Sequence, residues 1–286
     1  MLRSRDGALA EVYLNGAHVT SWRPAGTGEE RLFLSERSEF RAGSAIRGGI
    51  PIIFPQFAAE GPLPRHGFAR TAEWRLLRGN EHAEEPADGS ASATLQLESS
   101  EATRAIWPAE FVATLALHVV GERLAIALEV SNVGSRAFSF TSALHTYLRV
   151  DNAEQAQIEG LHGVRYRVSS APDVLRADED EVVRIAGEID RVYVDAPRQL
   201  VVREAARTTV LETAGFRDVI VWNPGPERGA ALADMEPGGD RRMLCVEAGA
   251  VQEPIVVAPG ARWEGRQTLI AAQHPDGILT PRPSTT

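Results

Sequence analysis

The chain contains no lysine, so its thirty basic residues are all arginine. This absence excludes enzymes that need a lysine amine: Schiff-base aldolases, enzymes that attach pyridoxal phosphate, and nucleotide-binding proteins with a P-loop. The sequence also has no GxSxG element of a serine hydrolase and no GxGxxG element of a dinucleotide site. Any catalytic chemistry must come from other groups, among which histidine, arginine and carboxylate side chains are present.

Cysteine is nearly absent as well. Cys245 is the single cysteine, which excludes an internal disulfide and any CxxC metal or redox pair. No apolar run approaches the roughly 18 residues of a transmembrane helix, and the N-terminus lacks the apolar segment of about 7 to 15 residues that is typical of a secretory signal. We therefore expect a cytoplasmic protein that does not enter membranes.

Positive charge is outweighed by negative charge, with a formal net charge of −9 at pH 7. Binding to nucleic acid through a broad basic surface depends on neutralising many phosphates, so this balance argues against a nucleic-acid partner. An anionic small molecule would instead need a local cluster of arginines.

Strand patterns dominate the chain. Apolar residues alternate through Phe111–Val130 on both sides of Gly121 and Glu122, which predicts a β-hairpin. Helical periodicity is weak and is best at residues 229–235, so an antiparallel, all-β sandwich or barrel is expected. We predict one domain over residues 1–273 and a C-terminal tail over residues 274–286. Further strands are predicted near residues 137–150, 164–168, 191–194, 200–203, 208–212, 218–222 and 263–270.

Three segments combine charged and apolar residues in an unusual way. Residues 47–70, RGGIPIIFPQFAAEGPLPRHGFAR, place arginines and a histidine among prolines and glycines, as expected for the wall of a binding site. His145 and Glu247 each lie in an otherwise apolar run, ALHTYLRV and MLCVEAGAV. A lone glutamate in such a run is costly to bury. On the residues alone, an arginine-paired carboxylate and a backbone-bonded core histidine are the favoured interpretations, with proton-transfer groups as the alternative.

The order and spacing of several motifs resemble the hexose-6-phosphate mutarotases, also called glucose-6-phosphate 1-epimerases, of the aldose 1-epimerase superfamily. The resemblance implies a large twisted antiparallel β-sandwich of the galactose-mutarotase type, with few short helices and a site on the concave face of one sheet. It runs nearly from end to end through the motifs LNGAHVTSW, RGGIP, PRHGFAR, LHTYLRV, IDRVYVD, VWNPG and MLCVEAGAV.

In such a mutarotase two proton-transfer groups suffice to open and reclose the sugar ring. The resemblance implies that Glu247 is the general base and His145 the general acid. Partial burial would raise the proton affinity of the base toward the working pH, and a nearby carboxylate or phosphate would hold the histidine protonated. No cofactor is required by this chemistry.

The resemblance also implies the substrate contacts. Arg47 and Arg70 match arginines associated with substrate, and guanidinium groups suit phosphate oxygens because they donate two parallel hydrogen bonds. His66 matches a histidine that lines the pocket, and Arg65 replaces a frequent glutamine. The remaining two candidates are Asp190, for which Asp195 is a competitor, and Trp222, which could equally be a packing residue.

We therefore expect an isomerase that interconverts the α and β anomers of a hexose 6-phosphate and works as a monomer on this small molecule. Two alternatives stay open: an aldose 1-epimerase that acts on unphosphorylated sugars, and a non-catalytic carbohydrate-binding protein of the same fold. His66, His145 and Glu247 could form a site of two histidines and one carboxylate, but their spacing does not demand a metal, and we predict none.

Overall fold

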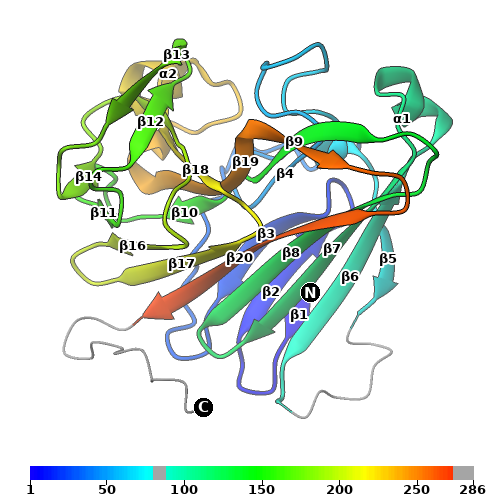
Figure 1. The fold of residues 1–286 in the computed structure, drawn as a ribbon. Coiled ribbons are helices and arrows are strands. Elements are labelled where there is room, and N and C mark those ends of the chain that lie inside the picture. The colour runs from blue at the N-terminus through cyan, green and yellow to red at the C-terminus, as the bar shows by residue number, and fades with distance from the viewer. Residues whose placement is uncertain (80–87, 273–286) are drawn as a thin grey trace, which may run out of the picture.

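The computed structural model describes residues 1–79 and 88–272. The predicted C-terminal tail lies outside these residues. Figure 1 shows strands throughout, with two short α-helices, α1 (Glu101–Ile106) and α2 (Gly225–Ala231). Two 3₁₀ turns, η1 (Ala69–Thr71) and η3 (Gly239–Arg242), complete the helical elements of the described part. No helix in these ranges is long and apolar enough to cross a membrane.

Two large antiparallel sheets form the body of the molecule (Figure 1). The nine-stranded sheet has the order β14 (Val182–Arg184), β11 (Gln157–Glu159), β16 (Gln199–Arg203), β17 (Thr208–Ala214), β20 (Arg262–Ala272), β8 (Arg123–Asn132), β7 (Phe111–Val120), β6 (Ala91–Glu98), β5 (Arg75–Arg78).

The eight-stranded sheet has the order β13 (Ala171–Ala177), β12 (Arg165–Val168), β15 (Ile189–Tyr193), β18 (Asp218–Asn223), β19 (Met243–Val257), β9 (Phe138–Leu144), β4 (Ile52–Ile53). Its eighth strand, β10 (Tyr147–Arg149), pairs with β19. A third sheet of β1 (Leu2–Arg3), β2 (Leu9–Tyr13) and β3 (His18–Arg23) adds its buried residues to the same hydrophobic core. The predicted antiparallel β-sandwich is therefore confirmed.

The predicted hairpin is confirmed as β7 and β8. Buried and partly exposed residues alternate strictly along Phe111–Val120, apart from the exposed Ala116 position, and Val120 pairs with Arg123 across a two-residue turn. The first turn residue, Gly121, has φ +55°, a backbone conformation that favours glycine. The alternation in the sequence thus specifies which face of this sheet meets the core.

The predicted helix at residues 229–235 is wrong in its position, since α2 spans Gly225–Ala231. A proline in its first turn, Pro226, starts the helix earlier because proline has no N–H to satisfy there and its φ suits a helix. Helix α1 was not predicted. It begins after Ser100, whose hydroxyl accepts a hydrogen bond from the Thr103 N–H. The Thr103 hydroxyl in turn accepts a hydrogen bond from the Ser100 N–H.

The eight-stranded sheet is covered on both faces where the predicted site lies. Along β19, Leu244, Val246 and Ala248 belong to the main core between the sheets, whereas Met243 and Cys245 belong to a separate cluster on the opposite face. Because side chains alternate along a strand, Glu247 points to this opposite face. One continuous hydrophobic cluster extends from Leu2 to Ala271, which supports a single domain.

His18 anchors the loop that carries Arg47. The ring of His18 is fully buried, and its Nε2 lies 2.7 Å from the Gly48 carbonyl oxygen, so the neutral ring donates there. Burial lowers the pKa of His18 to about 4, which the hydrogen bond to Gly48 only partly opposes. His18 is therefore a structural histidine.

This burial predicts a pH-dependent stability. In the unfolded chain histidine titrates near 6.5, so the unfolded state takes up a proton first and the folded state loses stability as pH falls from about 6.5 toward 4. His18→Gln keeps an N–H donor but cannot titrate. As the pH falls over this range, the free energy of unfolding should decrease in both proteins. We expect the decrease in His18→Gln to be smaller than in wild type by up to about 3 kcal/mol. Urea unfolding at several pH values measures the free energy of unfolding of wild type and variant. The same pH dependence in the two proteins would contradict the expectation.

Candidate active site

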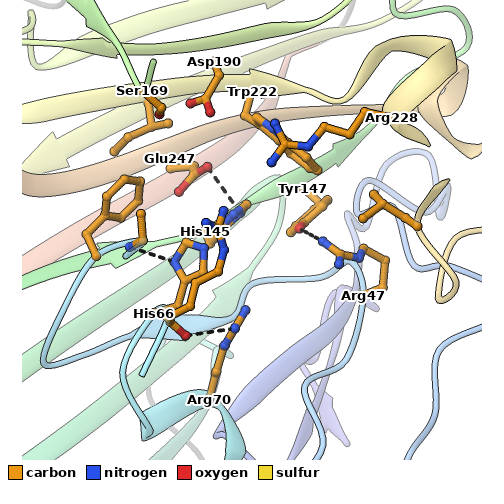
Figure 2. A pocket seen from close by; sticks show the side chains of 15 residues that line it. Arg47, His66, Arg70, His145, Tyr147, Ser169, Asp190, Trp222, Arg228 and Glu247 are labelled. Atoms are coloured by element: carbon orange, nitrogen blue, oxygen red, sulfur yellow. Dashed lines mark hydrogen bonds and ion pairs between the residues drawn. The ribbon is translucent and has the colours of Figure 1, made fainter. Parts of the chain in front are cut away.

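All eight residues predicted from the sequence to form the site line one cavity of about 250 Å³. They come from segments far apart in the chain: the connection between β3 and β4, the stretch from β4 into η1, the link between β9 and β10, and the strands β15, β18 and β19. Figure 2 shows Arg47 and Arg70 approaching from one side, with Asp190 and Ser169 on the other. The structure thus brings the predicted residues together, while their individual roles stay predictions.

Strand register explains the pocket floor. Asp190 pairs with Trp222, Trp222 pairs with Cys245, and Cys245 pairs with Tyr147. These four residues form a row across β15, β18, β19 and β10, and paired residues point to the same face of a sheet. Glu247 lies two positions further along β19, opposite Ile220.

His145 and Glu247 form a close pair at this floor (Figure 2). The His145 Nδ1 lies 3.3 Å from the Glu247 Oε1, and the two side chains are 10% and 1% exposed. Burial, with a contribution from the Asp190 charge, raises the pKa of Glu247 well above its usual range. Burial also lowers the pKa of His145, and His66, Arg47 and Arg70 add to this effect. Both shifts have burial as their largest cause and disfavour the charged forms of the two side chains.

His66 presents a fixed tautomer. Its backbone N–H donates to the Ala58 carbonyl oxygen at 2.8 Å, and its Nδ1 accepts from the Ala58 N–H at 3.3 Å. Burial, followed by the charges of nearby Arg70 and Arg65, lowers the pKa of His66 to about 2. The ring is therefore neutral with its proton on Nε2, and this nitrogen is a hydrogen-bond donor only.

The four pocket arginines differ in how their charge is compensated. The Arg47 guanidinium contacts the Asp234 carboxylate at 3.1 Å and donates to the Tyr147 hydroxyl at 2.9 Å. Arg228 is paired with Glu188 at 2.5 Å. The other two, Arg65 and Arg70, have no ion pair within residues 1–79 and 88–272.

Arg70 is held in place without being neutralised. Its Nη2 donates to the Arg65 carbonyl oxygen at 3.2 Å, and its buried Nε has no hydrogen-bond partner among the described residues. A buried donor without an acceptor is costly. An anionic ligand at this wall would satisfy it.

Asp190 and Trp222 occupy the other wall. Burial raises the pKa of Asp190, opposed by a hydrogen bond from Ser169 and the charges of Arg228 and Arg65. The Trp222 ring lies edge-on to the His145 ring, 6.0 Å between centroids. The competing candidate Asp195 lies outside this pocket and is paired with Arg217, so the structure favours Asp190.

Sequence reasoning missed three polar pocket residues: Tyr147, Ser169 and Arg228. The Tyr147 ring stacks on the His145 ring, with centroids 4.8 Å apart and planes 9° from parallel. Its position two residues after His145 is a signal that could have revealed it, since such residues share a face of a strand. Ser169 and Arg228 reach the pocket only through the tertiary fold.

The possible metal ligands also differ from those considered from the sequence. In the described part of the chain, His145, Cys245 and Glu247 have ligand atoms within 4.8 Å of one another. His66 is not part of this group.

The aldose 1-epimerase family model matches residues 1–269. The chain therefore belongs to the aldose 1-epimerase family, and it is an isomerase. Two relatives are named "putative glucose-6-phosphate 1-epimerase". The one from Cenchrus ciliaris is 36% identical over 290 residues, which cover 98% of this chain and 87% of that protein. The one from Escherichia coli K12 is 37% identical over 251 residues, which cover 85% and 80%.

Solved structures agree with this assignment. The crystal structure of the mutarotase-like YeaD from Salmonella typhimurium has a TM-score of 0.84 and 33% identity, covering 93% of this chain and 88% of YeaD. A galactose mutarotase-like protein from Lactobacillus casei has a TM-score of 0.74 at 13% identity, covering 95% and 99%, and supports the fold alone. The expected family and fold are confirmed.

The turn that presents His66 yields a stability prediction. Gly67 has φ +68°, and a Cβ there would lie 2.1 Å from the Phe54 carbonyl oxygen. Gly163 has φ +73° with nothing within 4 Å of a Cβ. We expect Gly163→Ala to cost about 1 to 2 kcal/mol of unfolding free energy, and Gly67→Ala about 2 to 5 kcal/mol because overpacking adds to the backbone strain. Urea denaturation compares them, and equal losses would show that the contact with Phe54 is relieved easily.

Proposed function

We propose that the protein interconverts the α and β anomers of a hexose 6-phosphate, in particular glucose 6-phosphate, without a cofactor. The observation that carries this proposal is the buried His145–Glu247 pair beside two pocket arginines, Arg65 and Arg70, that lack a carboxylate partner in the described chain. The pair supplies acid and base, and the arginines supply positive charge for a phosphate. The printed names of the two relatives agree with this substrate.

The reaction needs one proton removed and one delivered. Glu247 takes the proton of the C1 hydroxyl while His145 gives a proton to the ring oxygen, and the bond between C1 and the ring oxygen breaks. The open-chain aldehyde then rotates about its C1–C2 bond. Reclosure on the other face returns both protons, because the two groups exchange roles.

Substrate binding can set the required protonation. The positive charges of Arg47 and Arg70 contribute to the lowered pKa of His145. A phosphate placed against these arginines offsets that charge and thereby favours the proton on His145. The positive charge that His145 then carries favours a negative Glu247 beside it. In this proposal the phosphate group both binds and prepares the pair for reaction.

Arg70 is the primary phosphate contact in this proposal because its Nε lacks a partner. Arg65 adds charge on the same side, and Arg47 contributes the N–H groups that Asp234 and Tyr147 leave free. On the opposite wall, Asp190 accepts hydrogen bonds from sugar hydroxyls and the Trp222 ring covers sugar C–H groups. The neutral His66 donates from Nε2 and orients the sugar.

We further propose that the chain acts as a monomer with a single domain over residues 1–273, and that it acts in the cytoplasm on this small molecule.

The base can be tested by substitution. Glu247→Gln keeps the shape of the side chain but cannot accept the proton, so we expect anomer exchange of glucose 6-phosphate to slow by roughly 10²- to 10⁴-fold. Magnetisation-transfer NMR measures the exchange rate, and calorimetry measures binding, which we expect to persist. A near-normal exchange rate in the folded variant would show that Glu247 is not the general base. Binding without acceleration by the wild-type protein would identify a carbohydrate-binding protein instead.

The arginines test phosphate recognition. A hydrogen bond to a charged group contributes about 1.5 to 3 kcal/mol, so Arg70→Gln is expected to lower kcat/KM for glucose 6-phosphate by about 10- to 100-fold. Turnover of galactose, which has no phosphate, should change little. Arg228→Gln is the matched control, because Arg228 already has a carboxylate partner. Equal losses on both sugars in Arg70→Gln, or wild-type activity on galactose alone, would favour an aldose epimerase for unphosphorylated sugars.

A further inference from the structure

The floor of the pocket contains a second arrangement of donor atoms. A ring nitrogen of His145, the Cys245 Sγ and a Glu247 carboxylate oxygen lie within 4.8 Å of one another, and all three residues are buried. It is the one group of three possible metal ligands found in residues 1–79 and 88–272. Nitrogen, sulfur and oxygen donors together suit a divalent ion of intermediate softness, above all Zn²⁺.

Two of these residues have unsatisfied polar atoms. The Glu247 Oε2 is buried without a hydrogen-bond partner in the described chain. The buried His145 Nδ1 has no hydrogen bond there and contacts only the Glu247 Oε1, at 3.3 Å. Buried polar atoms are normally satisfied, so their lack of partners indicates that they can accept a ligand. Both residues line the pocket and thus connect it with Cys245 behind them.

The strands fix this arrangement. Cys245 and Glu247 are two residues apart on β19 and point to the same face of the sheet, and Cys245 pairs with Tyr147, two residues after His145. Zinc binds these donors at about 2.0 to 2.3 Å, which places donors on one tetrahedral ion about 3.5 Å apart. The widest separation here therefore has to contract by about 1 Å, which side-chain rotation can provide.

We propose that Zn²⁺ binds His145, Cys245 and Glu247 at the floor of the pocket and thereby inhibits the protein. Binding breaks the S–H bond of Cys245, whose proton leaves to solvent, and forms bonds from the metal to sulfur, nitrogen and oxygen. A water completes the four ligands. The inhibition rests on the proposed function, because the ion would occupy both proton-transfer groups. The binding of the ion does not depend on that function.

The local charges allow a dication here. The thiolate and the carboxylate together supply two negative charges, which match those of the ion, and Asp190 adds negative charge at the same floor. Of the nearby arginines, Arg47 is already paired with Asp234. Arg70 opposes the ion and limits its affinity.

Binding is tested with a probe that reports on the thiolate. Cd²⁺ is titrated into the full chain while the ultraviolet absorption of a cadmium–thiolate bond is recorded. We expect one equivalent to give this absorption, Cys245→Ala to abolish it, and Glu247→Gln to weaken the affinity by at least about 10-fold. Thermal unfolding confirms that the variants are folded. No thiolate absorption in the wild-type protein, or an unchanged affinity in Glu247→Gln, would overturn the site.

Inhibition is tested separately with buffered free Zn²⁺. Anomer exchange is followed in wild type and Cys245→Ala, each relative to its own rate without metal, so that chelation of zinc by the substrate affects both equally. We expect the inhibition constant to rise at least about 10-fold in Cys245→Ala. Equal inhibition of both would mean that zinc acts elsewhere. If Cd²⁺ binds as expected but neither form accelerates anomer exchange, the metal site stands and the proposed function fails.

Discussion

The burial of Glu247 next to His145 is the constraint on which the site depends. A carboxylate that is 1% exposed is tolerated only where its charge or its proton has a partner, and a histidine at 3.3 Å provides one. Both faces of β19 are covered at this point, so water does not solvate either group fully. The same burial that makes this pair costly for the fold raises the pKa of Glu247 and lowers the pKa of His145, and such strongly shifted groups in a cavity are typical of functional sites.

The arginines around the pocket fall into two groups, those with a carboxylate partner and those without one among the described residues. Arg47 with Asp234 and Arg228 with Glu188 are internal ion pairs, which hold the pocket walls in shape. Arg65 and Arg70, which have no ion pair among the described residues, leave positive charge at the cavity. A chain with a net charge of −9 can thus still attract an anion, because binding depends on the local arrangement of charges rather than on their total.

Much of this could be predicted from the sequence, for identifiable reasons. The alternation in Phe111–Val120 gives the hairpin directly, and the apolar neighbours of Glu247 indicate a strand covered on both faces. The resemblance to a family supplied the eight site residues. The contact between Arg47 and Asp234 could not be predicted in this way, because 187 residues separate them and neither belongs to a repeating pattern. Helix α2 was placed wrongly because its apolar residues were given more weight than the prolines that start it.

The pairing of strands across the pocket floor determines which pocket residues can change easily during evolution. Asp190, Trp222, Cys245 and Tyr147 keep their row only while four strands keep their register, and a shift by one residue would turn each of them into the core. The arginines come from connecting segments outside these strands, which tolerate insertion and exchange far better. Selection can therefore alter the arginines at the pocket wall while the strands that position Glu247 are inherited unchanged, so one scaffold can give rise to pockets for different ligands.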